Sequence, residues 1–83
     1  MLITAEHIKV GSELSAADLV QSFVDSGWNT DKNWSILDYQ FVGISNERFV
    51  YHIKYIDMLL NQELSGLVYI SWSPERGQWL GEI

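Results

Sequence analysis

The sequence FVYHIKYIDM, residues 49–58, places large apolar side chains at every second position. Phe49, Tyr51, Ile53 and Tyr55 share one parity, while the residues between them are mostly polar or smaller. Side chains of a β-strand point to opposite faces in turn, so this spacing is typical of a strand that lays one face on a core. The stretch predicts an inner strand of a sheet.

Three other stretches are rich in β-branched and aromatic residues, and short turn-forming segments separate all four. Pro74 and Gly77 suit the last of these turns, in which Gly permits a bulge. Strands joined in chain order by short turns form a four-stranded antiparallel meander. Its predicted strands are about 35–44, 49–58, 64–72 and 78–83.

A helix is predicted before the strands. Ser15 followed by Asp18 approximates a capping box, and Gly27 suits the left-handed residue after a helix end. Between them, apolar residues recur at the spacing of a helix that lies on a core. These residues are Ala16, Leu19, Val20, Phe23 and Val24. We therefore expect a helix over about 15–26 packed on the sheet, giving a single α+β domain over 1–83.

Hairpin turns centred on Asn46-Glu47 and Asn61-Gln62 predict which side chains share a face. In this register Val42 and Trp72 flank Tyr51, and Trp79 pairs with Trp72. The expected core face is Val42, Ile44, Phe49, Tyr51, Ile53, Tyr55, Val68, Ile70 and Trp72. The expected opposite face is Leu37, Tyr39, Phe41, Val50, His52, Lys54, Ile56, Leu67, Tyr69 and Ser71.

That second face is half apolar, which is more than a solvated sheet face requires. One interpretation is that 1–10 lies over part of it. Self-association is another, and a binding surface for a protein or small ligand is a third. Five residues on this face are the predicted partner-binding residues. They are Tyr39, Phe41, His52, Lys54 and Tyr69.

The net charge of −6 comes from eleven acidic and five basic residues, and the acids stand singly along the chain. This charge disfavours phosphate backbones, so we expect no nucleic-acid partner. No run approaches the ~20 apolar residues of a membrane helix, and 1–10 lacks the apolar run of a signal peptide. The absence of cysteine removes disulfides and thiolate metal sites. We expect a cytoplasmic protein without membrane contact.

No constellation of residues predicts catalysis. His52 would lie beside Phe41 and Ser71, but no acid shares that face to orient the imidazole. His7 and Glu6 lack further ligands at metal-binding spacing. The glycines match neither a dinucleotide fingerprint nor a phosphate-binding loop. The sequence therefore predicts a non-enzymatic protein with no metal and no cofactor.

Two functional hypotheses follow. The first is a protein-interaction module, such as a small acidic inhibitor, immunity or accessory protein, that uses the aromatic-rich sheet face. Its partner is another protein or a second copy of itself in a homodimer. The alternative is a small-molecule-binding domain with a pocket between helix and sheet, lined by Trp28 and Trp34.

Overall fold

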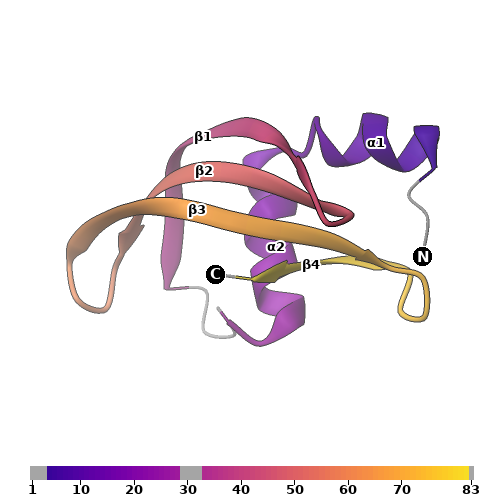
Figure 1. Cartoon of the computed structure of the whole chain (residues 1–83). Coiled ribbons are helices and arrows are strands. Elements are labelled where there is room, and N and C mark those ends of the chain that lie inside the picture. The colour runs from indigo at the N-terminus through magenta and orange to yellow at the C-terminus, as the bar shows by residue number, and fades with distance from the viewer. Residues whose placement is uncertain (1–3, 29–32, 83) are drawn as a thin grey trace.

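The computed structural model describes residues 4–28 and 33–82, which form two helices and one sheet (Figure 1). The strands lie in the order β1-β2-β3-β4, and every neighbouring pair is antiparallel. The predicted α+β class and meander topology are confirmed. The elements are α1 (Ala5–Gly11), α2 (Ala16–Ser26), β1 (Trp34–Ser45), β2 (Arg48–Asp57), β3 (Gln62–Ser73) and β4 (Gln78–Glu82).

Helix α2 is the predicted helix, with both predicted ends. The Asp18 N–H donates to the Ser15 hydroxyl and the Ser15 N–H donates to the Asp18 carboxylate, each at 3.2 Å, which completes a capping box. Gly27 follows with a φ of 92°, and the Trp28 N–H donates to the Phe23 carbonyl at 2.9 Å. The terminal turn thus finds partners for carbonyls that the helix itself leaves open.

Helix α1 was not predicted, because its seven residues are too few for apolar periodicity to show. Thr4 caps it by accepting from the His7 N–H at 3.2 Å. The His7 ring lies 5.3 Å from the Trp72 ring, and Gly11 sits directly against the Phe49 ring. The helix therefore packs on the same sheet face as α2. The interpretation that 1–10 covers the opposite face is wrong for 4–10, and residues 1–3 lie outside the described part.

The β1–β2 pairing corrects the predicted register. The turn is where it was expected, since Ser45 pairs with Arg48, but bulges interrupt β1 between Ile36 and Asp38 and between Phe41 and Gly43. A bulge adds one residue to one strand and so reverses the alternation beyond it. Phe41, rather than Val42, therefore opposes Tyr51.

The exchange at the second bulge has clear consequences for packing. Val42, expected in the core, is the extra residue of this bulge and is 58% exposed. Ile44, also expected in the core, still pairs with inner-face Phe49 but is 45% exposed. Phe41, expected on the opposite face, packs its ring 5.4 Å from Tyr51 and 6.3 Å from Phe49. The bulges therefore determine which apolar side chains of β1 face the core.

The β2–β3 turn lies earlier than expected. Asp57 pairs with Gln62, so Tyr51 opposes Val68 instead of Trp72. This displacement is four residues along β3. An even shift keeps side chains on the same face, so the face predicted for β3 is retained. The predicted pairing of Trp72 with Trp79 is confirmed, with ring centroids 5.1 Å apart.

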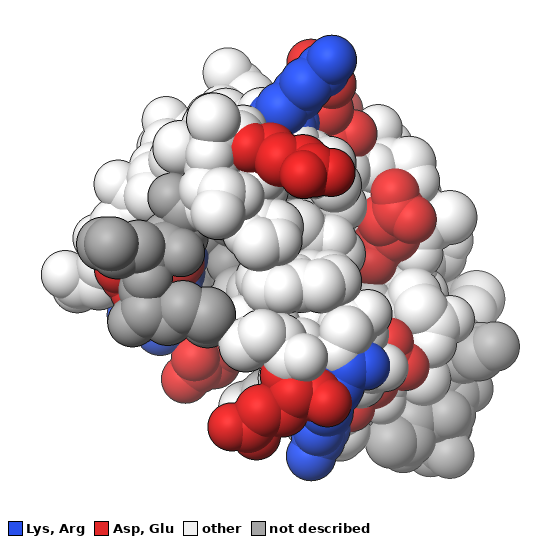
Figure 2. Space-filling view, turned by 90° about the vertical axis from the view of Figure 1, so that its right-hand side faces the viewer, with Lys and Arg blue, Asp and Glu red and all other residues white. Residues whose placement is uncertain are grey.

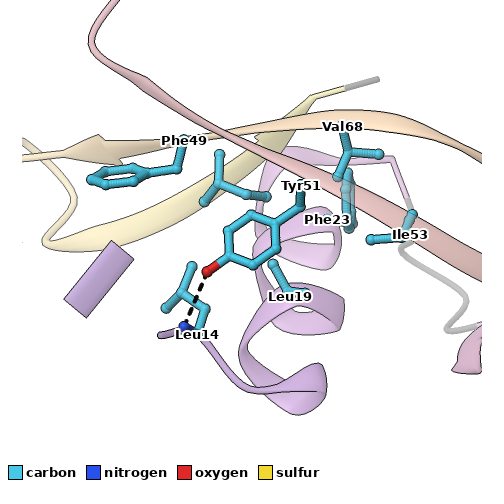
Figure 3. Packing of buried hydrophobic residues seen from close by; sticks show 8 residues of the cluster. Leu14, Leu19, Phe23, Phe49, Tyr51, Ile53 and Val68 are labelled. Carbon is cyan, nitrogen blue, oxygen red and sulfur yellow. Dashed lines mark hydrogen bonds between the residues drawn. The ribbon is translucent and has the colours of Figure 1, made fainter. Parts of the chain in front are cut away.

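The core lies between α2 and the sheet, and Tyr51 is at its centre (Figure 3). Burial of each large apolar side chain in this core stabilises the folded state by about 1.5 to 3 kcal/mol. The Tyr51 hydroxyl donates to the Gly11 carbonyl and accepts from the Leu14 N–H at 3.2 Å, which ties the segment between the helices to β2. The buried cluster is Leu14, Leu19, Phe23, Phe49, Tyr51, Ile53, Val68 and Ile70.

Candidate functional site

The two faces of β2 have different surroundings. Phe49, Tyr51 and Ile53 point into the core, and we call their side of the sheet the inner face. The β2 residues that alternate with these three, together with the β1 and β3 residues that pair with them, form the outer face. The core that α2 covers is on the inner face, which leaves the outer face as the candidate functional site. Its residues include Asp38, Gln40, Arg48, Val50, His52, Lys54, Glu63, Ser65, Leu67 and Tyr69.

Apolar groups occupy the middle of the outer face. Val50 pairs with Tyr69, and its side chain is buried although it points away from the core. Leu67, which pairs with His52, is 49% exposed. An apolar floor with a half-exposed leucine beside it resembles the centre of a protein interface more than a solvated sheet face.

Two ion pairs involve residues of this face. The Arg48 guanidinium lies 4.7 Å from the centre of the Tyr69 ring and 3.1 Å from the Glu82 carboxylate. The Lys54 ammonium lies 3.0 Å from the Glu63 carboxylate. The hydrogen bond to Glu63 and its negative charge raise the pKa of Lys54, so this group stays protonated. The pairs hold long side chains in defined positions around the apolar middle.

A hollow of about 340 Å³ opens at the Lys54 end of the outer face. It brings together three of the predicted partner-binding residues, Tyr39, His52 and Lys54. Tyr39 lines it although its backbone pairs with inner-face Ile53, so the β1 bulge also corrects the predicted outer-face position of Tyr39. The other lining residues are Asp38, Gln40, Glu63, Leu64 and Ser65.

The other two predicted partner-binding residues, Tyr69 and Phe41, do not line the hollow and lie on opposite faces of the sheet. Tyr69 is on the outer face under Arg48, away from the hollow. Phe41 is on the inner face, which corrects the expectation, because the β1 bulge turns it toward Phe49 and Tyr51.

Of the hollows lined by described residues, Trp34 and Trp28 line different ones. Trp34 stacks between Phe23 and Tyr55, at 5.7 and 4.9 Å, and lines a groove of about 410 Å³ between α2 and β1. Trp28, 52% exposed, lines a hollow of about 260 Å³ beside β4. The predicted pocket between helix and sheet thus corresponds to the groove at Trp34. That groove is lined by Ala16, Ala17, Val20, Gln21, Trp34, Ser35, Ile36 and Met58.

The tip of the β2–β3 hairpin is a feature that the sequence analysis missed. Met58, Leu59 and Leu60 are 55%, 76% and 65% exposed. The Asp57 carboxylate accepts from the N–H groups of Leu59 and Leu60, at 3.0 and 3.2 Å, while the Met58 N–H donates to the Asn33 carbonyl at 2.8 Å. The sequence did contain a signal for this feature, because three successive apolar residues in a turn indicate an exposed apolar surface.

Side-chain chemistry on the described residues is limited. His52 pairs with Gln40 and Leu67 instead of lying beside Phe41 and Ser71, so the serine of the hypothetical Ser–His pair is not its neighbour. Within 4–28 and 33–82, no group of three His, Cys, Asp or Glu side chains is placed to hold a metal ion. No helix in the described part is long and apolar enough to cross a membrane.

The chain is similar to short portions of two translation factors. It is 31% identical over 80 residues to Elongation factor 4 of Exiguobacterium sibiricum, and 30% identical over 84 residues to Elongation factor 4 of an Exiguobacterium species. The alignments cover 92% and 96% of this chain but only 12% and 13% of those proteins. No family model matches the chain. No solved structure matches it either.

Proposed function

We propose that this chain is a non-enzymatic, cytoplasmic protein-interaction module that binds another protein through the outer face of its sheet. The observation that carries the proposal is the apolar middle of that face, where exposed Leu67 lies beside His52 next to Val50 and Tyr69. Apolar surface rimmed by polar groups is a common mark of protein contact sites.

The residue types support this use of the face. Tyr and Arg are enriched among residues that dominate binding energy, and here Tyr69 and Arg48 are already stacked. The contact to Glu82 orients the guanidinium further. A partner therefore meets side chains that lose little rotational freedom on binding, which reduces the entropic cost of association.

The net charge narrows the choice of partner. A chain of net charge −6 attracts basic surfaces and repels acidic ones, which fits an inhibitor, immunity or accessory protein acting on a basic target. The similarity to part of two elongation factors makes components of translation the first class of partner to test.

Capture from lysate by the immobilised chain tests the proposal. Leu67→Asp places a charge in the apolar middle of the outer face and is expected to abolish retention of the partner. Leu59→Asp is the matched control, because Leu59 is an exposed leucine at the hairpin tip. Identical retention by both variants, or none by the wild type, would count against the outer face.

A small-molecule-binding domain is the alternative function. The groove between α2 and β1 favours it, because Trp34 lines it together with uncharged residues. A metabolite screen followed by tryptophan fluorescence would then give a saturable shift that Trp34→Phe removes. An unchanged spectrum across the screen, or a shift that survives Trp34→Phe, would argue against this function.

A further inference from the structure

The hollow at the Lys54 end of the outer face contains a carboxylate that has no ionic partner among the described residues. Asp38 of β1 pairs with Lys54 of β2. The Lys54 ammonium nevertheless contacts the Glu63 carboxylate of β3, at 3.0 Å. One Asp38 oxygen accepts from the N–H of Tyr39 at 2.9 Å, and no described basic group lies within ion-pair distance of this carboxylate. The hollow therefore contains a negative charge that no described side chain neutralises by direct contact.

The bulges of β1 place Asp38 on the outer face. In a strand that continued from the β1–β2 turn without interruption, Asp38 would oppose Tyr55 and lie on the inner face. The second bulge, between Phe41 and Gly43, shifts the pairing by one residue, so Asp38 pairs with outer-face Lys54 instead. Another bulge immediately precedes Asp38. Bulges change the direction of side chains and are common beside functional sites. They bring a carboxylate into the hollow that regular alternation would have turned toward the core.

The other lining residues add acceptors without adding charge. Gln40 and Ser65 carry an amide oxygen and a hydroxyl, and they belong to the strands on either side of β2. A guanidinium has five N–H donors and no acceptor, so it binds where acceptors surround it. Carboxylates are strong partners for it, because two parallel N–H···O bonds can form. The hollow has a volume of about 340 Å³, near the lower limit of roughly 300 Å³ for ligand pockets, which suits a single side chain.

A cationic group is favoured at short and at long range. The lining contains two carboxylates, Asp38 and Glu63, against one ammonium, Lys54. An anionic side chain would be repelled by both carboxylates and would find the ammonium already bound to Glu63. The whole chain carries a net charge of −6, and acidic side chains are also spread over the end of the molecule that contains α1 (Figure 2). The field of the chain thus attracts cations from a distance, and the hollow provides a contact for one of them.

We propose that this hollow receives an arginine side chain of the protein partner, with its guanidinium on the Asp38 carboxylate. The inference rests on the proposed function, because the arginine belongs to the protein that covers the outer face. Leu67 pairs with His52, which lines the hollow, so one partner covers the apolar middle and the hollow together. The charge pair then selects basic partners and fixes their register. Arginine suits the site better than lysine, because only a guanidinium binds a carboxylate through two parallel bonds.

Nuclear magnetic resonance titration of the full chain with blocked tripeptides tests the site without the partner. Acetyl-Gly-Arg-Gly-amide is compared with the same peptide containing citrulline, whose urea group resembles a guanidinium in shape but carries no charge. The arginine peptide is expected to shift the amide signals of Gln40, His52 and Ser65 saturably. The citrulline peptide should bind at least about 3-fold more weakly, because it cannot form the exposed charge pair.

Two variants of equal net charge locate the contact. Asp38→Asn removes the charge of the carboxylate and keeps an oxygen that accepts from the Tyr39 N–H. It should weaken binding of the arginine peptide about 3- to 5-fold. Glu75→Gln is the matched control, because it removes the same charge in the turn between β3 and β4, away from the hollow. Since salt screens distant charges, this control should leave the dissociation constant within about 1.5-fold of the wild-type value.

Three results of these titrations would overturn the proposal. The first is equal affinity for the arginine and citrulline peptides, and the second is an equal loss of affinity in Asp38→Asn and Glu75→Gln. The third is tighter binding of acetyl-Gly-Glu-Gly-amide, which would assign the hollow to an anion. Superimposable circular dichroism melts establish that the variants fold.

The capture experiment separates this inference from the proposed function. A partner whose retention requires Leu67 but is unchanged by Asp38→Asn would refute the arginine contact and leave the interaction function standing. Charge-dependent binding of the arginine peptide at the hollow, without any retained partner, would support the arginine site and count against the interaction function.

Discussion

Replacing Tyr51 with Phe removes one oxygen atom from the core and leaves the ring in place. That oxygen donates to the Gly11 carbonyl and accepts from the Leu14 N–H at 3.2 Å. Both hydrogen bonds are buried, and Tyr51 itself is 1% exposed. The substitution therefore leaves two buried backbone groups without their partner, and it loosens the link between α2, α1 and β2.

The expected loss is large for a domain of this size. Each buried polar group left unsatisfied costs about 1 to 3 kcal/mol, so two of them cost about 2 to 6 kcal/mol. A chain of this length has roughly 4 to 12 kcal/mol of stability in all. With a urea m-value of about 1 kcal/mol/M, the unfolding midpoint falls by about 2 M or more.

Urea titration followed by tryptophan fluorescence measures the difference. Tyr69→Phe is the matched control, because the Tyr69 ring stacks under Arg48 and Phe retains that contact. The control should change stability by no more than about 0.5 kcal/mol. Equal midpoints for the two variants would refute the assignment of the Tyr51 hydroxyl as a structural tie.

Alkaline unfolding, substitution of a crowded glycine and removal of a helix cap provide three further tests. Burial raises the pKa of Tyr51 above its ordinary value of 10.0, so the folded state favours the neutral phenol. The stability that this preference contributes is fully present below pH 10 and is lost as pH rises through the folded-state pKa. Stability, measured by urea titration, should therefore fall less steeply at alkaline pH in Tyr51→Phe than in the wild type. Gly81→Ala should cost about 1 to 3 kcal/mol in thermal melts, because its Cβ would lie 2.6 Å from the Phe23 ring, whereas Gly66→Ala meets nothing within 4 Å and should leave the core packing unchanged. Ser15→Ala should cost about 1 kcal/mol by the same melts, since α2 loses the acceptor for the Asp18 N–H, and an unchanged melting temperature would contradict that role of the cap.

Elements held by short-range interactions could be predicted from the sequence, whereas those that depend on contacts between distant segments could not. Helix α2 was predicted with its ends because Ser15, Asp18 and Gly27 act on backbone groups within a few residues of themselves. The meander and the Trp72–Trp79 pair were predicted because short turns leave neighbouring strands few ways to pair. Helix α1 was missed because it is one short segment whose position depends on contacts with β2 and β3.

The candidate site was predicted less completely than the fold. His52, Lys54 and Tyr69 were placed on the second sheet face, and the structure confirms that position. Phe41 was assigned to the wrong face, because period-two alternation cannot show where a bulge adds a residue. The tip was divided between a predicted strand and a predicted turn, so its three exposed side chains were not recognised as one surface.

Alternation along β2 and the capped amphipathic pattern of α2 were enough to predict a helix on an antiparallel sheet, because both patterns arise from the geometry of a single element. The bulges in β1, the four-residue displacement of β3 and the position of α1 depend on which side chains fill the space around Tyr51. That choice is made by packing between segments distant in the chain. Only the tertiary structure therefore showed which side chains of β1 lie on each face and that the tip lies beside the groove.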